Sequence, residues 1–363
     1  MVEKVEVDVL VVGAGPAGST TAEHAALNGA EVLLIEKRPV VGEPVRCGEF
    51  MPHVEEISQI FPDALDIAPL FEIPGDLRLL ETAYIRLYSP KMRSWEVPFA
   101  GYTTDRGRFD QYLAKRAVKA GAKLITGVKY NGLRDGVALA DGMEIKAKVV
   151  VGADGPLSKV AKDAGLGRST DLCPAVTVQV NGDFDPMPEM YFGSVAPGGY
   201  AWIIPKKGSA NVGLGVAKRF AKMTVGEYFD RFLEQKGLRS EMPVMGKFVP
   251  MSGPIRRAVN GNIMLVGDAA GQVMAVNGGG IPIAMLCGRF AGRVAAMHIK
   301  NGAPLEDYES LCRKQIYGPL RTAVRTKMLA NTCFGSTWRL EMAMRSLGQR
   351  RINKLIRCKP ILP

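Results

Sequence analysis

A glycine-rich turn near the start of the chain has the spacing of a phosphate-binding loop. An apolar, largely β-branched run over 7–12 is typical of a strand buried in a parallel sheet, and G-A-G-P-A-G at 13–18 follows directly. Gly13 permits a tight turn, Gly15 lets backbone N–H groups approach a pyrophosphate, and Gly18 lets the next helix pack closely. The N-terminus of that helix carries partial positive charge, which favours bound phosphates.

An acid at the end of the next expected strand indicates which dinucleotide the loop would bind. That strand is expected over 31–36 and ends on Glu36, which lies 23 residues after Gly13. A carboxylate there accepts hydrogen bonds from an adenosine ribose and repels a 2′-phosphate. Lys37 and Arg38 are compatible with NADP, but they lie beyond the strand end, so the sequence favours a dinucleotide without that phosphate.

A second motif, far along the chain, has the features of the other half of an FAD site. The buried strand expected over 262–266 leads into Gly267-Asp268, and Asp268 can bond the ribose or ribityl hydroxyls on the flavin side; alone, it is equally typical of a helix N-cap. The stretch 277–281 then opens a helix whose N-terminus would stabilise negative charge on a reduced flavin; the alternative is a flexible loop.

With four further motifs, these halves resemble the geranylgeranyl reductase family, within the p-hydroxybenzoate-hydroxylase-like FAD proteins. The resemblance covers roughly residues 7–302. Its most specific motif is P-V-R-C-G-E at 44–49, similar to archaeal-type reductases of isoprenoid lipids. The others are D-R-G-R-F-D at 105–110, G-A-D-G at 152–155 with Ser158, and P-G-G-Y-A-W-I-I-P at 197–205 before G-L-G at 213–215, where Ile204 stands in place of the family's usual Phe.

The resemblance implies a set of FAD-contacting positions. Arg106 would reach the pyrophosphate or ribityl chain, and Val128 would flank the adenine. We add Arg46 from the P-V-R-C-G-E motif and the three glycines of the phosphate loop. The expected cofactor-binding residues are therefore Gly13, Gly15, Ala17, Gly18, Glu36, Arg46, Cys47, Gly48, Phe50, Arg106, Val128, Asp268, Gly280 and Ile281.

The resemblance also implies a reaction, the saturation of isolated alkenes in geranylgeranyl chains. Hydride would pass from reduced FAD to one carbon and a proton to its neighbour. Cys47 is the candidate proton donor, although a thiol there can equally be a packed small side chain, and His53 is a second candidate. Tyr200 and Trp202 are two residues apart on an expected strand, so their side chains face the same side. There they would line a long isoprenoid channel or form core between two layers. The resemblance favours the channel.

The expected fold is α/β with an α+β insert. A Rossmann-type FAD-binding domain is expected in three parts, 1–83, 106–170 and 256–302. An inserted antiparallel substrate sheet would comprise a hairpin at 84–105 and the strands of 171–255. A basic helical segment is expected over 303–363. This arrangement would place a substrate cavity between the flavin and the inserted sheet.

The formal net charge of +11 resides in the last part of the chain. Residues 310–363 hold 12 Lys and Arg against one acid, Glu341. A helix over 336–357 would separate an apolar face from a basic face with Arg350, Lys354 and Arg357, which predicts contact with an anionic membrane; the alternative is a solvated helix that closes the cavity. With neither a secretory signal nor a run of about 18 apolar residues, the expected location is cytoplasmic, peripheral on the inner membrane face.

The expected partners are an isoprenoid lipid and an external reductant, with no nucleic acid. No second dinucleotide fingerprint is visible, so ferredoxin, a reduced deazaflavin and transient NAD(P)H all remain candidates. The six cysteines form no C-x-x-C pair, so no metal site is expected, and pairing of Cys333 with Cys358 stays open.

Two rival functions remain. The stretch 200–205 is one residue from the W-x-W-x-I-P motif of flavin halogenases, so a monooxygenase or halogenase of an apolar substrate is one alternative. The other is a non-catalytic flavin electron-transfer protein at the membrane. The P-V-R-C-G-E motif favours the reductase.

Overall fold

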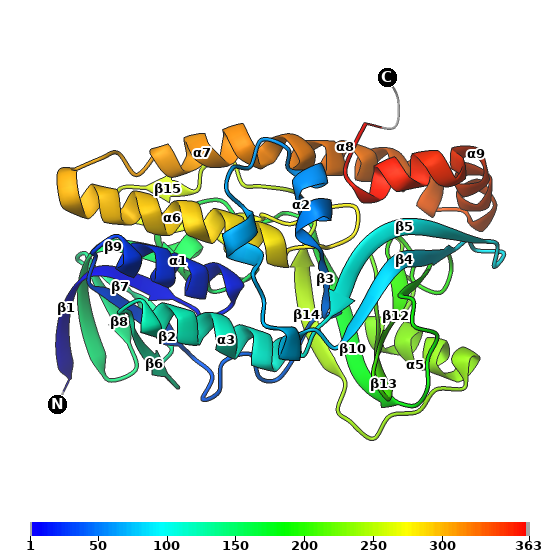
Figure 1. Cartoon of the computed structure of the whole chain (residues 1–363), viewed down its shortest axis with the longest axis horizontal. Helices are drawn as coiled ribbons and strands as arrows, with labels where there is room; N and C mark the ends of the chain where they lie inside the picture. Colours follow the sequence, from blue (N-terminus) through cyan, green and yellow to red (C-terminus); the bar gives the residue numbers. More distant parts are fainter. Residues whose placement is uncertain (1, 361–363) are drawn as a thin grey trace.

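Two β-sheets, joined side by side, organise the protein. The computed structural model describes residues 2–360 (Figure 1). The first sheet has the order β15-β16-β9-β1-β2-β6, with the β7-β8 hairpin beside β9. Its strands are β1 (Glu3–Val12), β2 (Val32–Glu36), β6 (Lys123–Thr126), β7 (Tyr130–Arg134), β8 (Val137–Ala140), β9 (Met143–Gly152), β15 (Val259–Asn260) and β16 (Ile263–Leu265).

The centre of the first sheet is parallel, as its apolar strand sequences predict. β1 pairs in parallel with both β2 and β9, and β9 pairs in parallel with β16. Residues 9–12 of β1 are buried because helices cover this sheet. Helix α1 (Pro16–Leu27) connects β1 to β2, which confirms the expected Rossmann-type β-α-β unit.

The second sheet is mainly antiparallel and has the order β14-β10-β13-β12-β11-β4-β5-β3. β11 and β4 form a parallel pair within it. Its strands are β3 (Phe50–Pro52), β4 (Leu80–Tyr88), β5 (Ser94–Thr103), β10 (Leu172–Asn181), β11 (Glu189–Tyr191), β12 (Tyr200–Lys206), β13 (Ser209–Gly215) and β14 (Met245–Pro250).

Helix α5 (Val225–Lys236) covers one face of the second sheet. Phe229 and Phe232 of α5 pack in one apolar cluster with Ala201, Ile203 and Val212 of the strands. Because side chains alternate along a strand, Tyr200 and Trp202 lie on the opposite face, which is turned toward the first sheet. The alternation expected for these two aromatic residues therefore places them between the two parts of the molecule.

The remaining helices connect and cover the two sheets. Helix α9 (Thr337–Ile356), which was expected to be one continuous helix, is interrupted at Gly348, which has non-helical dihedral angles. No helix within residues 2–360 is long and apolar enough to span a bilayer. The helices are α2 (Val54–Ile60), α3 (Arg106–Lys119), α4 (Lys159–Asp163), α6 (Ile281–Asn301), α7 (Asp307–Gln315), α8 (Tyr317–Phe334) and α9 (Thr337–Ile356).

Where the chain first passes from the first sheet to the second, the strand bounds differ from those expected. β4 begins at Leu80 rather than Tyr84, and β3, within the first expected part of the FAD domain, pairs with β5 of the second sheet. Short strands such as β3 lack the repeated alternation that makes a strand visible in a sequence. The division into domains stays a prediction.

Helices α1 and α6 pack backbone against backbone because α6 carries two glycines at the contact. A Cβ atom on Gly288 would lie 2.6 Å from the Ala17 carbonyl oxygen. One on Gly292 would lie 2.8 Å from the Ala25 amide nitrogen and would also meet the Thr21 carbonyl oxygen. Backbone atoms cannot rotate away as side chains do, so larger residues must separate the helices.

We predict that Gly292→Ala lowers the thermal unfolding midpoint. Overpacking costs about 1–3 kcal/mol, which corresponds to a few degrees in a protein of this size. Gly318→Ala in α8 is the matched control, because a Cβ there meets no atom within 4 Å. Calorimetry should show a decrease for Gly292→Ala alone; equal midpoints for the two variants would contradict the close-packing account.

Candidate functional site

The loop between β1 and α1 has the geometry of a phosphate cradle. Gly13 has a φ of +102°, and a Cβ on it would lie 2.6 Å from the Ala153 carbonyl oxygen. A Cβ on Gly18 would collide with the Gly13 carbonyl group, so Gly18 allows the helix to pack on the loop. A Cβ on Gly15, by contrast, meets no protein atom within 4 Å. The space beside Gly15, at the start of α1, therefore fits a ligand such as the pyrophosphate of FAD.

Glu36 joins the end of β2 to this loop. Its carboxylate accepts hydrogen bonds from the Ala14 amide at 2.9 Å and from the Arg38 amide at 3.0 Å. The Val128 amide donates to the Glu36 carbonyl oxygen at 2.9 Å, which brings Val128 to the same edge of the sheet. This arrangement fits an adenosine bound between Glu36 and Val128.

The second half of the expected site lies directly against the first. A Cβ on Gly267 would lie 2.8 Å from the Ala17 Cβ. Asp268 follows in a short 3-10 turn. A Cβ on Gly280 would lie 3.5 Å from a carboxylate oxygen of Asp268. Helix α6 begins at Ile281 with Gly280 as its N-cap. Residues about 250 positions apart thus form one continuous surface.

Helices α1 and α6 run in parallel with an offset between their N-termini. Gly288 lies against Ala17 and Thr20, so the first residues of α6 extend beyond the start of α1. Each helix N-terminus favours negative charge. One extended molecule with phosphates at α1 and a flavin at α6 can therefore contact both ends, which is the fit that FAD requires.

The loop at 44–49 brings Cys47 to Arg106, the first residue of α3. The Arg106 guanidinium donates to the Cys47 Sγ at 3.0 Å and forms an ion pair with Asp110 at 2.7 Å. Burial opposes the charge of Arg106, but Asp110 and Cys47 raise its pKa above the usual range. The Glu49 amide is a second donor to the Cys47 sulfur, at 3.2 Å.

The other residues expected near this loop lie at different depths. Arg46 is exposed, whereas Gly48 lies under the second sheet, where a Cβ would be 3.1 Å from Ile204. Phe50 lies on β3 with its ring 6.1 Å from that of Phe99. His53, the second candidate proton donor, has its Nε2 atom 2.7 Å from the Glu81 carboxylate.

Tyr200 and Trp202 form an aromatic row with Phe192. The ring centroids are 5.7 Å apart between Phe192 and Tyr200 and 5.9 Å apart between Tyr200 and Trp202. The Trp202 ring lies over Gly213, where a Cβ would be 2.6 Å from a ring carbon, and beside Gly48. The glycine of the G-L-G motif therefore makes room for the Trp202 ring.

Tyr200 ties the second sheet to the glycine-rich loop before α6. Its hydroxyl donates to the Asn277 carbonyl oxygen, and burial raises the pKa of Tyr200. The aromatic row thus spans from the loop at Asn277 to the loop at Gly48. It forms an apolar wall above the surface where the flavin is expected.

Four polar residues at this junction were not expected as site residues: Lys206, Lys247, Glu49 and Asn211. Lys247 of β14 pairs with the Asp268 carboxylate at 2.7 Å, and Lys206 pairs with Glu49 at 2.6 Å. Asn211 of β13 is fully buried beside them. In the sequence, Asn211 is the one polar residue among the small and apolar residues of 210–215. That position could have indicated a buried polar contact.

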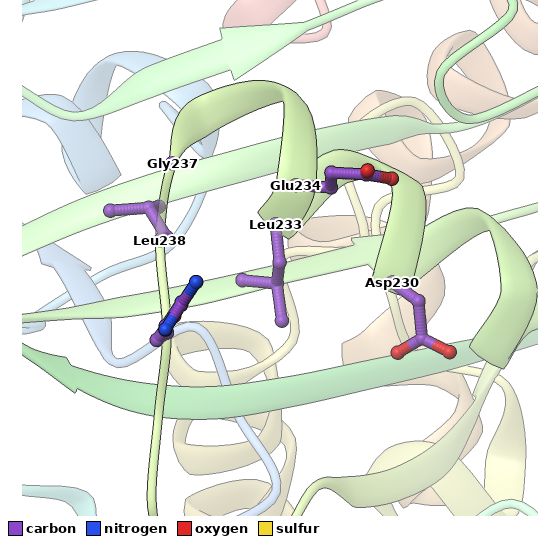
Figure 2. A pocket seen from close by; sticks show the side chains of 6 residues that line it. Asp230, Leu233, Glu234, Gly237 and Leu238 are labelled. Atoms are coloured by element: carbon purple, nitrogen blue, oxygen red, sulfur yellow. The ribbon is translucent and has the colours of Figure 1, made fainter.

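Two surface cavities lie away from the aromatic row. One of about 380 Å³ lies at the end of α5 and is lined by Asp230, Leu233, Glu234, Gly237, Leu238 and Arg239 (Figure 2). Another of about 420 Å³ lies between α3 and the loop after β2. Neither is lined by Tyr200 or Trp202, so the long apolar channel above the flavin stays a prediction.

We predict that Gly15→Val weakens FAD binding at least about tenfold without unfolding the protein. The new side chain would enter the space that fits a pyrophosphate, and lost hydrogen bonds to charged groups cost about 1.5–3 kcal/mol, a tenfold or greater loss of affinity. Gly75→Val is the control, because a Cβ there also meets no neighbour. Visible absorbance and thermal unfolding would be measured; a yellow, FAD-replete Gly15→Val protein refutes the assignment.

Comparison with known proteins agrees with this geometry. Residues 172–248 match the family model for the geranylgeranyl reductase catalytic domain, and residues 8–43 match that for FAD dependent oxidoreductases. A digeranylgeranylglycerophospholipid reductase of Methanocaldococcus jannaschii is 38% identical over 351 residues, covering 89% of this chain and 86% of the relative. Digeranylgeranylglycerophospholipid reductase 1 of Methanothermobacter thermautotrophicus is 38% identical over 350 residues, with the same coverage.

Solved structures give the same result for the fold. The crystal structure of a geranylgeranyl bacteriochlorophyll reductase-like protein from Thermoplasma acidophilum has a TM-score of 0.83 and 30% identity, covering 97% of this chain and 92% of that one. A flavin-dependent brominase has a TM-score of 0.71 at 18% identity, covering 98% and 94%, and shows the fold alone. The identity over nearly the full length shows that this chain is an FAD-dependent oxidoreductase that belongs to the geranylgeranyl reductase family.

Proposed function

We propose that this protein saturates the C=C bonds of geranylgeranyl chains on isoprenoid glycerophospholipids. The observation that carries the proposal is the aromatic row, whose Trp202 ring lies beside Gly48 in the loop that holds Cys47. The relatives named as digeranylgeranylglycerophospholipid reductases support this substrate class. An apolar wall this close to the expected flavin suits a hydrocarbon chain, which offers no polar group for recognition.

FAD supplies the hydride chemistry, and the protein supplies alignment and the proton. Because an isolated alkene has no carbonyl group to stabilise charge, catalysis depends on alignment and on the exclusion of water. Cys47 is the proposed proton donor. Its sulfur accepts hydrogen bonds from Arg106 and from the Glu49 amide, which hold the side chain in one position.

The reductant belongs to one of three classes: ferredoxin, a reduced deazaflavin or NAD(P)H. The halogenase alternative rests on the motif at 200–205 and on a fold shared with a brominase at 18% identity. Incubation with oxygen and bromide separates the two reactions, because a halogenase gives a brominated product, whereas a reductase adds two hydrogens per double bond.

We predict that Trp202→Ala reduces lipid hydrogenation far more than FAD content. A displaced substrate chain costs on the order of 100-fold in rate, since the reacting atoms no longer align. Chemically reduced protein would be incubated anaerobically with a geranylgeranyl glycerophospholipid, and the product measured by mass spectrometry. Cys47→Ala, as a companion variant, should also keep FAD and lose product. Loss of FAD in proportion to activity would instead make Trp202 a core residue.

The proposed membrane contact lies on the α8–α9 hairpin. Large apolar side chains are exposed there, with Met328 66% and Trp338 64% exposed. Leu329 and Met342 are also exposed, and Glu341, the acid of this region, is buried. Nearby exposed cations can contact anionic headgroups, each contributing about 1 kcal/mol; they are Arg321, Arg325, Arg339 and Arg345.

One residue of the basic face expected from the sequence is not available to a membrane. Arg357 is buried, and its guanidinium donates to both carboxylate oxygens of Glu56 and to the Pro98 carbonyl oxygen. Arg357 therefore attaches the end of α9 to helix α2 and to β5 of the second sheet. The expectation that it faces lipid was wrong because helical spacing shows which side chains share a face, but not what that face contacts.

We predict salt-sensitive binding to anionic liposomes through this hairpin. Sedimentation should show weaker binding after Arg325, Arg339 and Arg345 are changed to Gln, and after Trp338→Ser with Met342→Ser. Arg350→Gln with Arg351→Gln and Lys354→Gln removes the same number of exposed charges and serves as the matched charge control outside the apolar region. Equal loss in the control would place the contact on the end of α9 instead, and unchanged binding by all variants would contradict membrane contact through either surface.

A further inference from the structure

A buried polar cluster joins the flavin-side loop to the second sheet. Glu49 is 1% exposed, and one oxygen of its carboxylate accepts three hydrogen bonds. The donors are Lys206 at 2.6 Å, Gln179 at 2.5 Å and Asn211 at 2.9 Å, from β12, β10 and β13 respectively. Its other oxygen accepts from the Arg106 amide at 3.1 Å. The charge of Glu49 is thus compensated by groups from two separate parts of the fold.

Asn211 is the member of this cluster that connects both walls of the site. Besides Glu49, its side-chain nitrogen donates to the Cys47 carbonyl oxygen at 2.9 Å. Its side-chain oxygen accepts from the Trp202 indole nitrogen at 2.8 Å and from the Thr177 hydroxyl at 2.7 Å. Because an indole nitrogen can only donate, the orientation of the amide is fixed. All four bonding positions of the Asn211 side chain are used.

The strand register explains why one amide can reach so many partners. Asn211 lies opposite Gln179 in β10, and Gly213, two residues on, lies opposite Trp202 in β12. Gly213 has no side chain, so the indole ring folds over it toward Asn211. The single polar atom of Trp202 is thereby fixed to the same amide that holds the backbone of Cys47.

We propose that Asn211 is a positioning residue of the reaction, whose amide sets the substrate wall at Trp202 against the flavin-side loop at Cys47. The inference rests on the proposed function, since it assumes that a hydrocarbon chain lies between that wall and the flavin. A hydrocarbon cannot be aligned by hydrogen bonds, so its position depends on the position of the walls. Displacement of a wall by about 1 Å is sufficient to cost on the order of 100-fold in rate.

The test uses FAD-loaded protein with Asn211→Leu and with Trp202→Phe. Asn211→Leu keeps the approximate size of the side chain but removes its four hydrogen bonds, and Trp202→Phe keeps a ring but removes the donor to Asn211. Each reduced protein is mixed with a geranylgeranyl glycerophospholipid or with oxygen. We expect the ratio of the lipid rate to the oxygen rate to fall by about 10- to 100-fold, and the combined variant to lose less than the product of the two effects.

Asn260→Leu is the control, because the Asn260 amide donates to the Ala164 carbonyl oxygen outside the site. It should leave the ratio unchanged. A wild-type ratio in Asn211→Leu would overturn the proposal, as would lipid and oxygen rates that fall together. If Asn211→Leu does not fold, Trp202→Phe alone decides, because it leaves the Asn211 bonds to Glu49 and Cys47 in place.

A second readout separates failure of this inference from failure of the proposed function. Alkylation of Cys47 by iodoacetamide, followed by peptide mass spectrometry, requires no lipid. Loss of the Asn211 bond to Cys47 should speed alkylation several-fold in Asn211→Leu and leave it unchanged in Asn260→Leu. If wild-type protein is not oxidised by the lipid, the proposed function fails, whereas unchanged alkylation in Asn211→Leu means that Asn211 does not position the loop.

Discussion

The close parallel packing of α1 on α6 is the constraint on which the site depends. Gly288 and Gly292 allow the two helix backbones to approach, and Gly267 allows the second half-site to lie against Ala17. Because the helices are parallel and offset, their two positive N-terminal ends can contact one extended ligand at different depths. In this interpretation neither half is sufficient alone, since the first would hold the phosphates of FAD and the second its flavin end. The fold converts two distant motifs into one binding surface.

In the proposed function, the second sheet supplies the wall against which a hydrocarbon chain lies. Its outer face is occupied by α5, so the alternating residues of β12 project toward the flavin side. Tyr200 bonds the loop before α6, and Trp202 lies beside the loop that contains Cys47. The sheet is thus attached at both edges of the expected flavin surface. A wall held in this way can align a substrate that has no polar group in its reacting part.

Motifs that are continuous in the chain were predictable, because their function depends on neighbouring backbone atoms. The glycines at 13–18 and the strand ending at Glu36 are of this kind. The cluster around Asn211 was not predictable, because its partners are 9 to 164 residues away and no spacing rule specifies them. For the same reason the burial of Arg357 against Glu56 was missed. Helical periodicity indicates a face of a helix, whereas the contacts of that face are decided by the tertiary fold.

The most direct test of the account is an anaerobic single turnover followed in the flavin spectrum. Protein with stoichiometrically reduced FAD would be mixed with a geranylgeranyl glycerophospholipid, and in parallel with the fully saturated lipid. The account predicts that the unsaturated lipid restores the oxidised spectrum, with one C=C bond saturated for each flavin oxidised, and that the saturated lipid has no effect. A flavin that stays reduced with both lipids, yet is rapidly oxidised by oxygen, would contradict the claim that this site hydrogenates isoprenoid chains.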